Sequence, residues 1–223
     1  MDRGIVLVSG GMDSLVAAAI AVQECTPAFL HVSYGQRTQQ RELECFHRIT
    51  DHYEVRHRLV VRADALAKIG GSALTDNRIP VEDAVAVGNR VPATYVPFRN
   101  THLLAAAVSW AEVLGAQRVY IGAVEQDAPG YPDCRREYYQ VFNELIEVGT
   151  KGDPPIRVYT PLIGLSKVEI VQLGARMRAP FELTWSCYRS EERPCGTCHS
   201  CVVRAAAFRE ASLPDPVLEA PPA

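Results

Sequence analysis

The stretch Ser9-Gly10-Gly11-Met12-Asp13-Ser14 constrains this chain most, because it stands between a short apolar run and a helix-forming one. Ile5–Val8 before it is typical of a buried strand, and Leu15–Val22 after it is typical of a helix. Such a turn aims backbone N–H groups at an anion, and its glycines let a phosphate come close. The sequence therefore predicts a phosphate loop at residues 9–14. The alternative is an ordinary strand–turn–helix corner whose glycines serve geometry alone.

Strand and helix patterns alternate along most of the chain. Strands are expected at Ile5–Val8, Ala28–Ser33, Val55–Val61, Arg118–Ile121 and Val158–Tyr159, and helices up to Glu24 and at Gln36–His52, Thr101–Leu114, Cys134–Val148, Lys167–Arg178 and Val202–Ala211. This order predicts an α/β fold with a doubly wound parallel sheet, whose ligands bind at the carboxyl ends of the strands. Two stretches, 69–97 and 128–135, lack a clear period, and long loops of this kind are usually functional or disordered.

Length and charge limit the possible classes. The 223 residues, 48% of them hydrophobic, suffice for one α/β domain at 1–183, followed by a cysteine-rich segment at 184–211 and a flexible tail at 212–223. A net charge of −3 gives no reason to expect direct nucleic-acid binding. The absence of a long apolar run argues against a membrane span. The first strand starts almost at once, which leaves no room for a signal peptide, so we expect a cytoplasmic protein.

Four of the seven cysteines fall within fifteen residues, with the spacing C-x7-C-x2-C-x2-C. They are Cys187, Cys195, Cys198 and Cys201. Four thiolates close a tetrahedral site and leave no position for water, so the sequence predicts a structural zinc site. An iron–sulfur cluster is the alternative, although the ferredoxin spacing is not met. His199 could replace one ligand.

The phosphate loop matches the SGGxDS pattern of the pyrophosphate-loop (PP-loop) ATPases, and the chain resembles that class. Further segments narrow the resemblance to the 7-cyano-7-deazaguanine synthase family, from residue 5 to about 208. They are Tyr34-Gly35-Gln36, Leu74-Thr75-Asp76, Val96-Pro97-Phe98-Arg99-Asn100, Gly130-Tyr131-Pro132-Asp133-Cys134-Arg135, Leu165-Ser166-Lys167 and Thr184-Trp185-Ser186-Cys187-Tyr188. Phe98 departs from the family pattern, which usually has glycine there.

The resemblance implies a ligase that uses ATP and ammonia to convert 7-carboxy-7-deazaguanine to 7-cyano-7-deazaguanine, on the path to queuosine in tRNA. Adenylation of the carboxylate, and then of the amide, would release AMP and pyrophosphate twice. The resemblance also suggests a homodimer. Three alternatives stay open: a tRNA-modifying PP-loop enzyme such as a thiolase, a nucleotide-binding module without catalysis, and a paralogue that adenylates a different deazapurine or a protein carboxyl terminus.

The expected nucleotide site includes Val8, Ser9, Gly10, Gly11, Met12, Asp13, Ser14 and Asp127. Backbone N–H groups and hydroxyls of the loop would hold the β and γ phosphates. Lys167, at a helix start, would reach the α phosphate, and Asp13 and Asp127 are candidates for magnesium. A solvated lysine and a simple turn aspartate are the alternatives at Lys167 and Asp127.

The expected substrate site draws on the two irregular stretches. Arg99 could pair with a carboxylate or phosphate, or close the loop through a salt bridge. Tyr131 offers a ring for stacking, and Asp133 a carboxylate for the guanidine-like edge of a purine. Arg135 stands beside them. Cys134 is left out of catalysis because the chemistry needs no thiol.

Overall fold

A single parallel sheet organises the computed structural model, which describes residues 2–87, 91–127 and 130–218. Its strands are β1 (Arg3–Leu7), β2 (Thr26–Ser33), β3 (His57–Arg62), β4 (Arg118–Tyr120) and β5 (Arg157–Tyr159), in the order β3-β2-β1-β4-β5. Every pairing is parallel, and β1 lies between β2 and β4, with Ile5 opposite both Ala28 and Val119. The predicted α/β fold with a doubly wound parallel sheet is confirmed.

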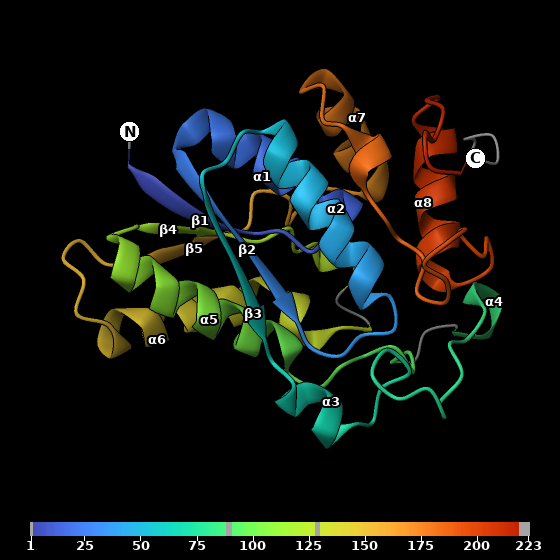
Figure 1. Ribbon diagram of the computed structural model, residues 1–223, viewed down its shortest axis with the longest axis horizontal. Helices are drawn as coiled ribbons and strands as arrows, with labels where there is room; N and C mark the ends of the chain where they lie inside the picture. The colour runs from blue at the N-terminus through green and yellow to red at the C-terminus, as the bar shows by residue number, and fades with distance from the viewer. Residues whose placement is uncertain (1, 88–90, 128–129, 219–223) are drawn as a thin grey trace.

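Helices cover both faces of this sheet (Figure 1). They are α1 (Met12–Glu24), α2 (Gln39–His52), α3 (Ala65–Ile69), α4 (Ala84–Val87), α5 (Arg99–Leu114), α6 (Arg136–Gly149), α7 (Lys167–Arg176) and α8 (His199–Glu210). One face carries α5 and α6, and the other carries α1, α2 and α7, with α8 beside α7. Short 3₁₀ turns lie at Glu125–Asp127, Pro132–Cys134 and Phe181–Leu183.

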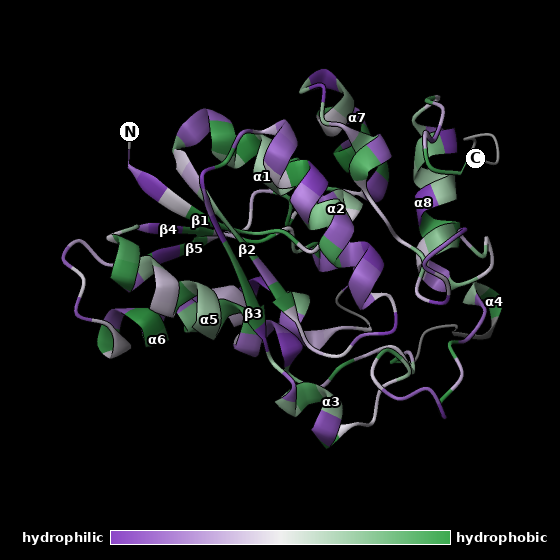
Figure 2. Ribbon diagram, viewed as in Figure 1, coloured by the Kyte–Doolittle hydropathy of each residue, from purple (hydrophilic) through white to green (hydrophobic). Residues whose placement is uncertain are grey.

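Two hydrophobic layers, one on each side of the sheet, form the core. Leu15, Phe29 and Phe46 are fully buried in the layer under α1 and α2. Leu104 and Phe142 belong to the layer under α5 and α6. The central strands β1 and β2 each contain an apolar stretch, whereas α2 turns a polar face outward (Figure 2). This pattern is expected for strands that helices bury on both sides.

The cysteine-rich segment and the first irregular stretch pack together at one end of the molecule. The backbones of Asp83 and Cys198 form an isolated antiparallel β-bridge, and α4 lies beside α8 (Figure 1). The Arg189 side chain donates hydrogen bonds to the Val81 carbonyl and pairs with Asp83 at 2.8 Å. The parts of the irregular stretches at 88–90 and 128–129 lie outside the described residues.

The structure departs from the sequence predictions at several element boundaries and in the tail; α8, for example, begins at His199 rather than Val202. Helix α5 begins at Arg99 rather than Thr101, so Asn100 lies inside its first turn and Phe98 occupies the cap position without a side-chain hydrogen bond. Helix α2 begins at Gln39 rather than Gln36. In the tail, Asp215 is buried and accepts hydrogen bonds from Arg204 at 2.7 and 2.9 Å, which fixes this part of the expected flexible segment on α8. Residues 219–223 lie outside the described part.

Candidate active site

The phosphate loop lies at the carboxyl end of β1 and opens into a cavity of about 260 Å³. The N-cap of α1 is Gly11, and no side chain caps the helix there. The Ser9 and Ser14 hydroxyls of the phosphate loop are 3.1 Å apart, and the Ser14 hydroxyl donates to the Gly11 carbonyl at 2.9 Å. An uncapped helix start beside two hydroxyls is an anion-binding arrangement, because the first N–H groups of a helix lack intrahelical acceptors.

Two glycines allow this loop to pack closely. Gly10 has a φ of 89°, and a Cβ there would lie 2.7 Å from the Glu42 carbonyl oxygen. A Cβ on Gly122, after β4, would lie 2.7 Å from the Asp13 carbonyl. Side chains at either position would displace the backbone of the loop or of α2.

Lys167 lies within ion-pair distance of both predicted magnesium ligands. Its ammonium is 2.8 Å from Asp13 Oδ2 and 2.9 Å from Asp127 Oδ2. Ser166 caps α7 with a capping box to Glu169, and this cap fixes Lys167 at the first helical position. The three groups come from the first turn of α1 after β1, the 3₁₀ turn after β4 and the start of α7 after β5, so they meet at the carboxyl edge of the sheet.

One ammonium balances two carboxylates in this cluster. Burial alone would lower the pKa of Lys167, but Asp13 and Asp127 outweigh it and raise that pKa. Burial raises the pKa of Asp127, and the nearby Asp13 charge adds to that rise against the opposing effect of Lys167. Both directions indicate that Lys167 stays charged and that two carboxylates share its single positive charge. The cluster therefore has an excess of negative charge. A cation in the site would relieve that excess.

Asp13 supplies a further observation on magnesium. Its Oδ1 atom is buried and has no hydrogen-bond partner among the described residues. An unpartnered carboxylate oxygen next to a phosphate-binding turn suits the oxygen-ligand preference of magnesium. Asp13 and Asp127 therefore fit a magnesium–nucleotide complex.

A second part of the cavity lining is aromatic and contains both a cation and a carboxylate. The Arg99 guanidinium lies 5.9 Å from the centre of the Tyr34 ring and donates to its hydroxyl at 3.5 Å. Glu42 of α2 and Tyr188 also belong to this part of the lining. The Glu42 carboxylate accepts hydrogen bonds from Gln36 Nε2 at 2.9 Å and from Thr38 Oγ1 at 2.8 Å.

Behind Arg99, Asp133 holds the start of α5. Its Oδ2 atom accepts the Asn100 N–H at 2.9 Å, and its carbonyl oxygen accepts from Asn100 Nδ2 at 3.0 Å. The Asp133 side chain is buried, and its Oδ1 atom has no hydrogen-bond partner among the described residues. Arg135 is exposed at the cap of α6. Neither Asp133 nor Arg135 is among the described residues that line the cavity.

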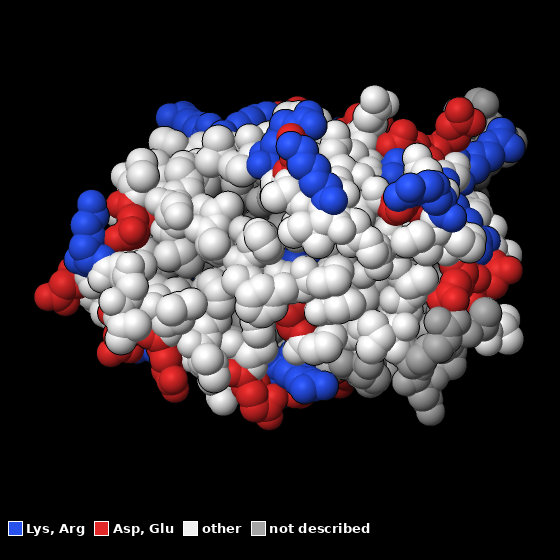
Figure 3. Space-filling model, turned by 90° about the horizontal axis from the view of Figure 1, so that it is seen from below, with Lys and Arg blue, Asp and Glu red and all other residues white. Residues whose placement is uncertain are grey.

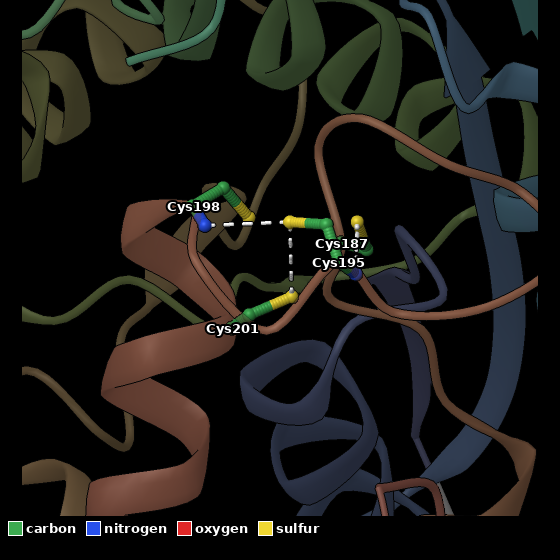
Figure 4. Close-up of side chains that lie close together, drawn as sticks. All are labelled: Cys187, Cys195, Cys198 and Cys201. Atoms are coloured by element: carbon green, nitrogen blue, oxygen red, sulfur yellow. Dashed lines mark hydrogen bonds between the residues drawn. The ribbon is translucent and has the colours of Figure 1, made fainter. Parts of the chain in front are cut away.

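The four cysteines of the C-terminal segment form a tight cluster, with all four sulfur atoms within 4.8 Å of one another (Figure 4). Sulfur atoms on a tetrahedral zinc ion lie about 3.8 Å apart at a zinc–sulfur distance of about 2.3 Å. Backbone N–H groups of Cys195 and Arg189 donate to Cys187 Sγ, and that of Cys198 donates to Cys195 Sγ. N–H groups aimed at sulfur favour thiolates, so the residues fit a closed metal site.

This cysteine cluster connects directly to the phosphate loop. The Trp185 N–H donates to the Gly10 carbonyl oxygen at 2.9 Å, two residues before Cys187. Arg204 of α8 is almost fully buried and donates to the Thr184 hydroxyl at 2.7 Å. The segment 184–187 is therefore held between α8 and the loop, and Cys187 itself lines the cavity.

Most of the residues that the sequence singled out meet at this cavity. Those that line it are Val8, Ser9, Gly11, Met12, Asp13, Ser14, Arg99, Asp127, Tyr131 and Lys167. Gly10 supports the loop from outside the lining. Sequence reasoning missed Glu42 as a site residue, and it did not place Tyr188 in the site. The polar, charged start of α2 resembles a solvated helix face, so only its closeness to Gly10 could have drawn attention to Glu42.

The surface gives no sign of a broad basic face in the view from below (Figure 3). Acidic and basic side chains alternate around the rim, and the centre carries neither kind over a wide area.

No helix in the described part of the chain combines the length and apolar character that a membrane crossing requires.

A phosphate loop at the carboxyl edge of a parallel sheet, beside a lysine–aspartate cluster, places this chain in the PP-loop class of α/β proteins. Residues 3–212 match the family model described as "Queuosine biosynthesis protein QueC". The chain belongs to this family.

Curated relatives are similar over nearly their whole length. A protein of Chlorobium limicola named 7-cyano-7-deazaguanine synthase is 52% identical over 216 residues, which are 96% of this chain and 96% of the relative. One of Acidobacterium capsulatum with the same name is 54% identical and covers 97% and 96%. Among solved structures, an NMN synthetase from Francisella tularensis has a TM-score of 0.48 at 17% identity, over 82% of this chain and 63% of its own, a likeness too weak to carry function.

Proposed function

We propose that this protein is a 7-cyano-7-deazaguanine synthase, which joins ammonia to 7-carboxy-7-deazaguanine in two ATP-dependent steps. The observation that supports this most is that the phosphate loop, Lys167 and Arg99 all line one cavity. Relatives more than 50% identical carry this name. The product belongs to queuosine biosynthesis, the process that names the family.

The chemistry requires activation of an inert oxygen twice. A carboxylate has no leaving group, so its oxygen attacks the α phosphate of ATP and pyrophosphate leaves. Ammonia then displaces AMP and gives the amide. The amide oxygen attacks a second ATP, and loss of AMP with two protons leaves the nitrile. The balance is one carboxylate, one ammonia and two ATP for one nitrile, two AMP and two pyrophosphate.

The residues that carry these steps would act in two parts of the cavity. N–H groups of the phosphate loop and the Ser9 and Ser14 hydroxyls would hold the departing pyrophosphate. Lys167 would offset charge on the α phosphate, where a fixed cation contributes most during transfer. Arg99 would pair with the carboxylate of the substrate, and Tyr131 would pack against the base. Asp133, behind the cavity, would position Arg99 and Asn100.

Magnesium would be held by Asp13 and Asp127 and would supply charge neutralisation on the nucleotide phosphates. Zinc would be held by Cys187, Cys195, Cys198 and Cys201, where it would fasten the C-terminal segment to the phosphate loop. The proposal includes a cytoplasmic homodimer, whose mass in solution would be twice the chain's 24.5 kDa.

The proposed function can be tested with purified protein, 7-carboxy-7-deazaguanine, ammonium and ATP. Mass spectrometry should find the amide early and the nitrile at the end, with two AMP formed per nitrile. Formation of ADP in place of AMP, or of neither amide nor nitrile while AMP accumulates, would contradict the proposal.

A further inference from the structure

Three carboxylates line the described part of the cavity: Asp13, Asp127 and Glu42. The first two are paired with Lys167 at 2.8 and 2.9 Å. Glu42 lies on α2, whose backbone packs against Gly10 of the phosphate loop, and it has no ion pair to a lysine or arginine within the described residues. Both its oxygen atoms accept hydrogen bonds from neutral groups. A carboxylate that lies in a ligand cavity without a salt bridge is a candidate to accept hydrogen bonds from the ligand.

The neighbours of Glu42 fix both its orientation and its hydrogen-bonding state. The Tyr34 backbone N–H donates to Gln36 Oε1 at 2.9 Å, so the Gln36 amide must present its NH₂ group to Glu42 Oε2. Thr38 donates to the other oxygen. An ionised carboxylate has about four acceptor positions. Two therefore stay available, one on each oxygen, for a ligand that offers two parallel donors.

Burial raises the pKa of Glu42, and the donors Gln36 and Thr38 oppose that rise. The hydrogen bonds from Gln36 and Thr38 therefore do not fully offset the cost of burying the ionised Glu42 carboxylate. Donors from a bound ligand would complete its hydrogen bonding and favour the charged form.

We infer that Glu42, rather than Asp133, reads the amino-pyrimidinone edge of the deazaguanine through its two parallel N–H donors. This inference rests on the proposed function. The ring N1–H and the exocyclic amino group of that edge form a pair of donors that match a carboxylate. Asp133 cannot serve in the same way without a rearrangement, because it is buried behind the described cavity lining and holds the Asn100 N–H.

The placement of Glu42 suits the rest of the base. Tyr34 and Tyr188 also line the cavity and offer ring faces for stacking. Glu42 follows β2 and Lys167 follows β5, with β1 and its phosphate loop between them in the sheet order. The carboxyl group lies on the five-membered ring, away from the amino-pyrimidinone edge. Recognition of that edge at Glu42 would therefore leave the carboxyl group to face the rest of the cavity, whose lining includes Arg99 and the phosphate loop.

Ammonium is the rival occupant of Glu42, and the neighbouring charge disfavours it. Arg99 lies close enough to act electrostatically on Glu42. Its guanidinium repels a second cation but leaves a neutral base unaffected, and it attracts the carboxylate that the same base carries.

The test compares Glu42→Gln with the wild type and with Glu44→Gln, an exposed glutamate two residues along α2. Affinity for 7-carboxy-7-deazaguanine and KM for the base, ATP and ammonium are measured separately. Glu42→Gln should weaken base affinity and raise its KM on the order of 10²-fold, since a buried donor pair loses its charged acceptor. KM for ATP should stay within about twofold, and Glu44→Gln should match the wild type.

An analogue without the exocyclic amino group provides a second measurement. The wild type should discriminate against it by at least about tenfold, and Glu42→Gln should lose most of that discrimination. Should Glu42→Gln fold poorly, Glu42→Asp, which keeps the charge one methylene further back, should show an intermediate loss of both affinity and discrimination.

An unchanged base KM in Glu42→Gln, a rise confined to the KM for ammonium, or loss of discrimination in Asp133→Asn instead would overturn the inference. These results would leave the proposed function intact as long as the wild type forms the nitrile. A wild type that binds the base in a Glu42-dependent way but makes no AMP would contradict the proposed function alone.

Discussion

Phe98 adopts a backbone conformation that disfavours its own side chain. Its φ of 58° lies in the left-handed region, and the side chain is 58% exposed. A non-glycine residue there costs about 1–2 kcal/mol, whereas glycine adopts the conformation freely. The glycine that the resemblance leads one to expect at this position would make the same turn before Arg99 without that cost.

Replacement of Phe98 by glycine should stabilise the protein. The relief of strain exceeds the added chain entropy by about 0.5–1 kcal/mol, because the exposed ring contributes little packing. Urea unfolding of Phe98→Gly measures the gain. Phe98→Ala is the matched control, since it removes the ring but keeps Cβ, and it should stay near the wild type. Equal gains in both variants would show that the ring, not the backbone, causes the cost.

Cys134 gives a pH-dependent prediction. Burial raises the pKa of its thiol from 9.0 to about 12. Above pH 9 the unfolded chain releases this proton while the folded chain keeps it, so stability falls as pH rises through the window between 9 and 12. The slope is up to about 1.4 kcal/mol per pH unit. In urea unfolding between pH 8 and 11, Cys134→Ala should show a shallower decline than the wild type, and parallel declines would contradict the assignment.

At the scale of elements, hydrophobic pattern located all five strands and the six long helices, because each buries one face or both in a layer of core. The pattern failed where contacts distant in sequence set the boundary. The pattern starts this helix at Thr101, yet Asp133 accepts the Asn100 N–H and holds Asn100 in the first turn of α5. The start of α2 moves to Gln39 because the Gln36 side chain accepts the Tyr34 N–H instead.

The start of α7 was predicted at the observed residue, Lys167, because the residues that cap this helix are close together in sequence. The Glu169 N–H donates to Ser166 Oγ, and Glu169 Oε2 accepts the Ser166 N–H at 2.8 Å. Ser166→Ala should lower the free energy of unfolding by about 1 kcal/mol and slow pyrophosphate release, because the helix start that carries Lys167 would fray. Ser109→Ala, at an exposed position within α5, is the control for the substitution itself. Full activity in Ser166→Ala would show that Lys167 is held by Asp13 and Asp127 alone.

At the scale of the whole molecule, the sequence revealed the phosphate loop and the cysteine cluster because each is compact in sequence. It did not reveal that they touch. Trp185 donates to Gly10 across 175 residues, and Arg204 pairs with Asp215 in a proline-rich tail whose composition predicts disorder. Glu42 was missed for a related reason. Gln36 and Thr38, which hold its carboxylate, are close in sequence, but Arg99 and Tyr188, which line the same cavity, come near it only after folding.

Because the cysteine cluster contacts the phosphate loop, loss of a metal from the cluster should impair both stability and ATP binding. Cys198→Ser should reduce bound zinc, lower the melting temperature and weaken ATP binding about tenfold or more, since the segment that holds Gly10 loses its anchor. Metal analysis, thermal melting and nucleotide titration measure these effects. Cys25→Ser changes a buried thiol outside the cluster and should keep the metal. Unchanged ATP affinity after complete metal loss would separate the two sites.

The central claim is that the phosphate loop serves adenylation of the substrate's own oxygen atoms, and isotope transfer tests it most directly. The substrate is prepared with both carboxylate oxygens as oxygen-18 and converted with ammonium and excess ATP. The account predicts that both labelled atoms leave as AMP, one in each of the two molecules formed per nitrile. Unlabelled AMP, or label in inorganic phosphate beside ADP, would contradict it.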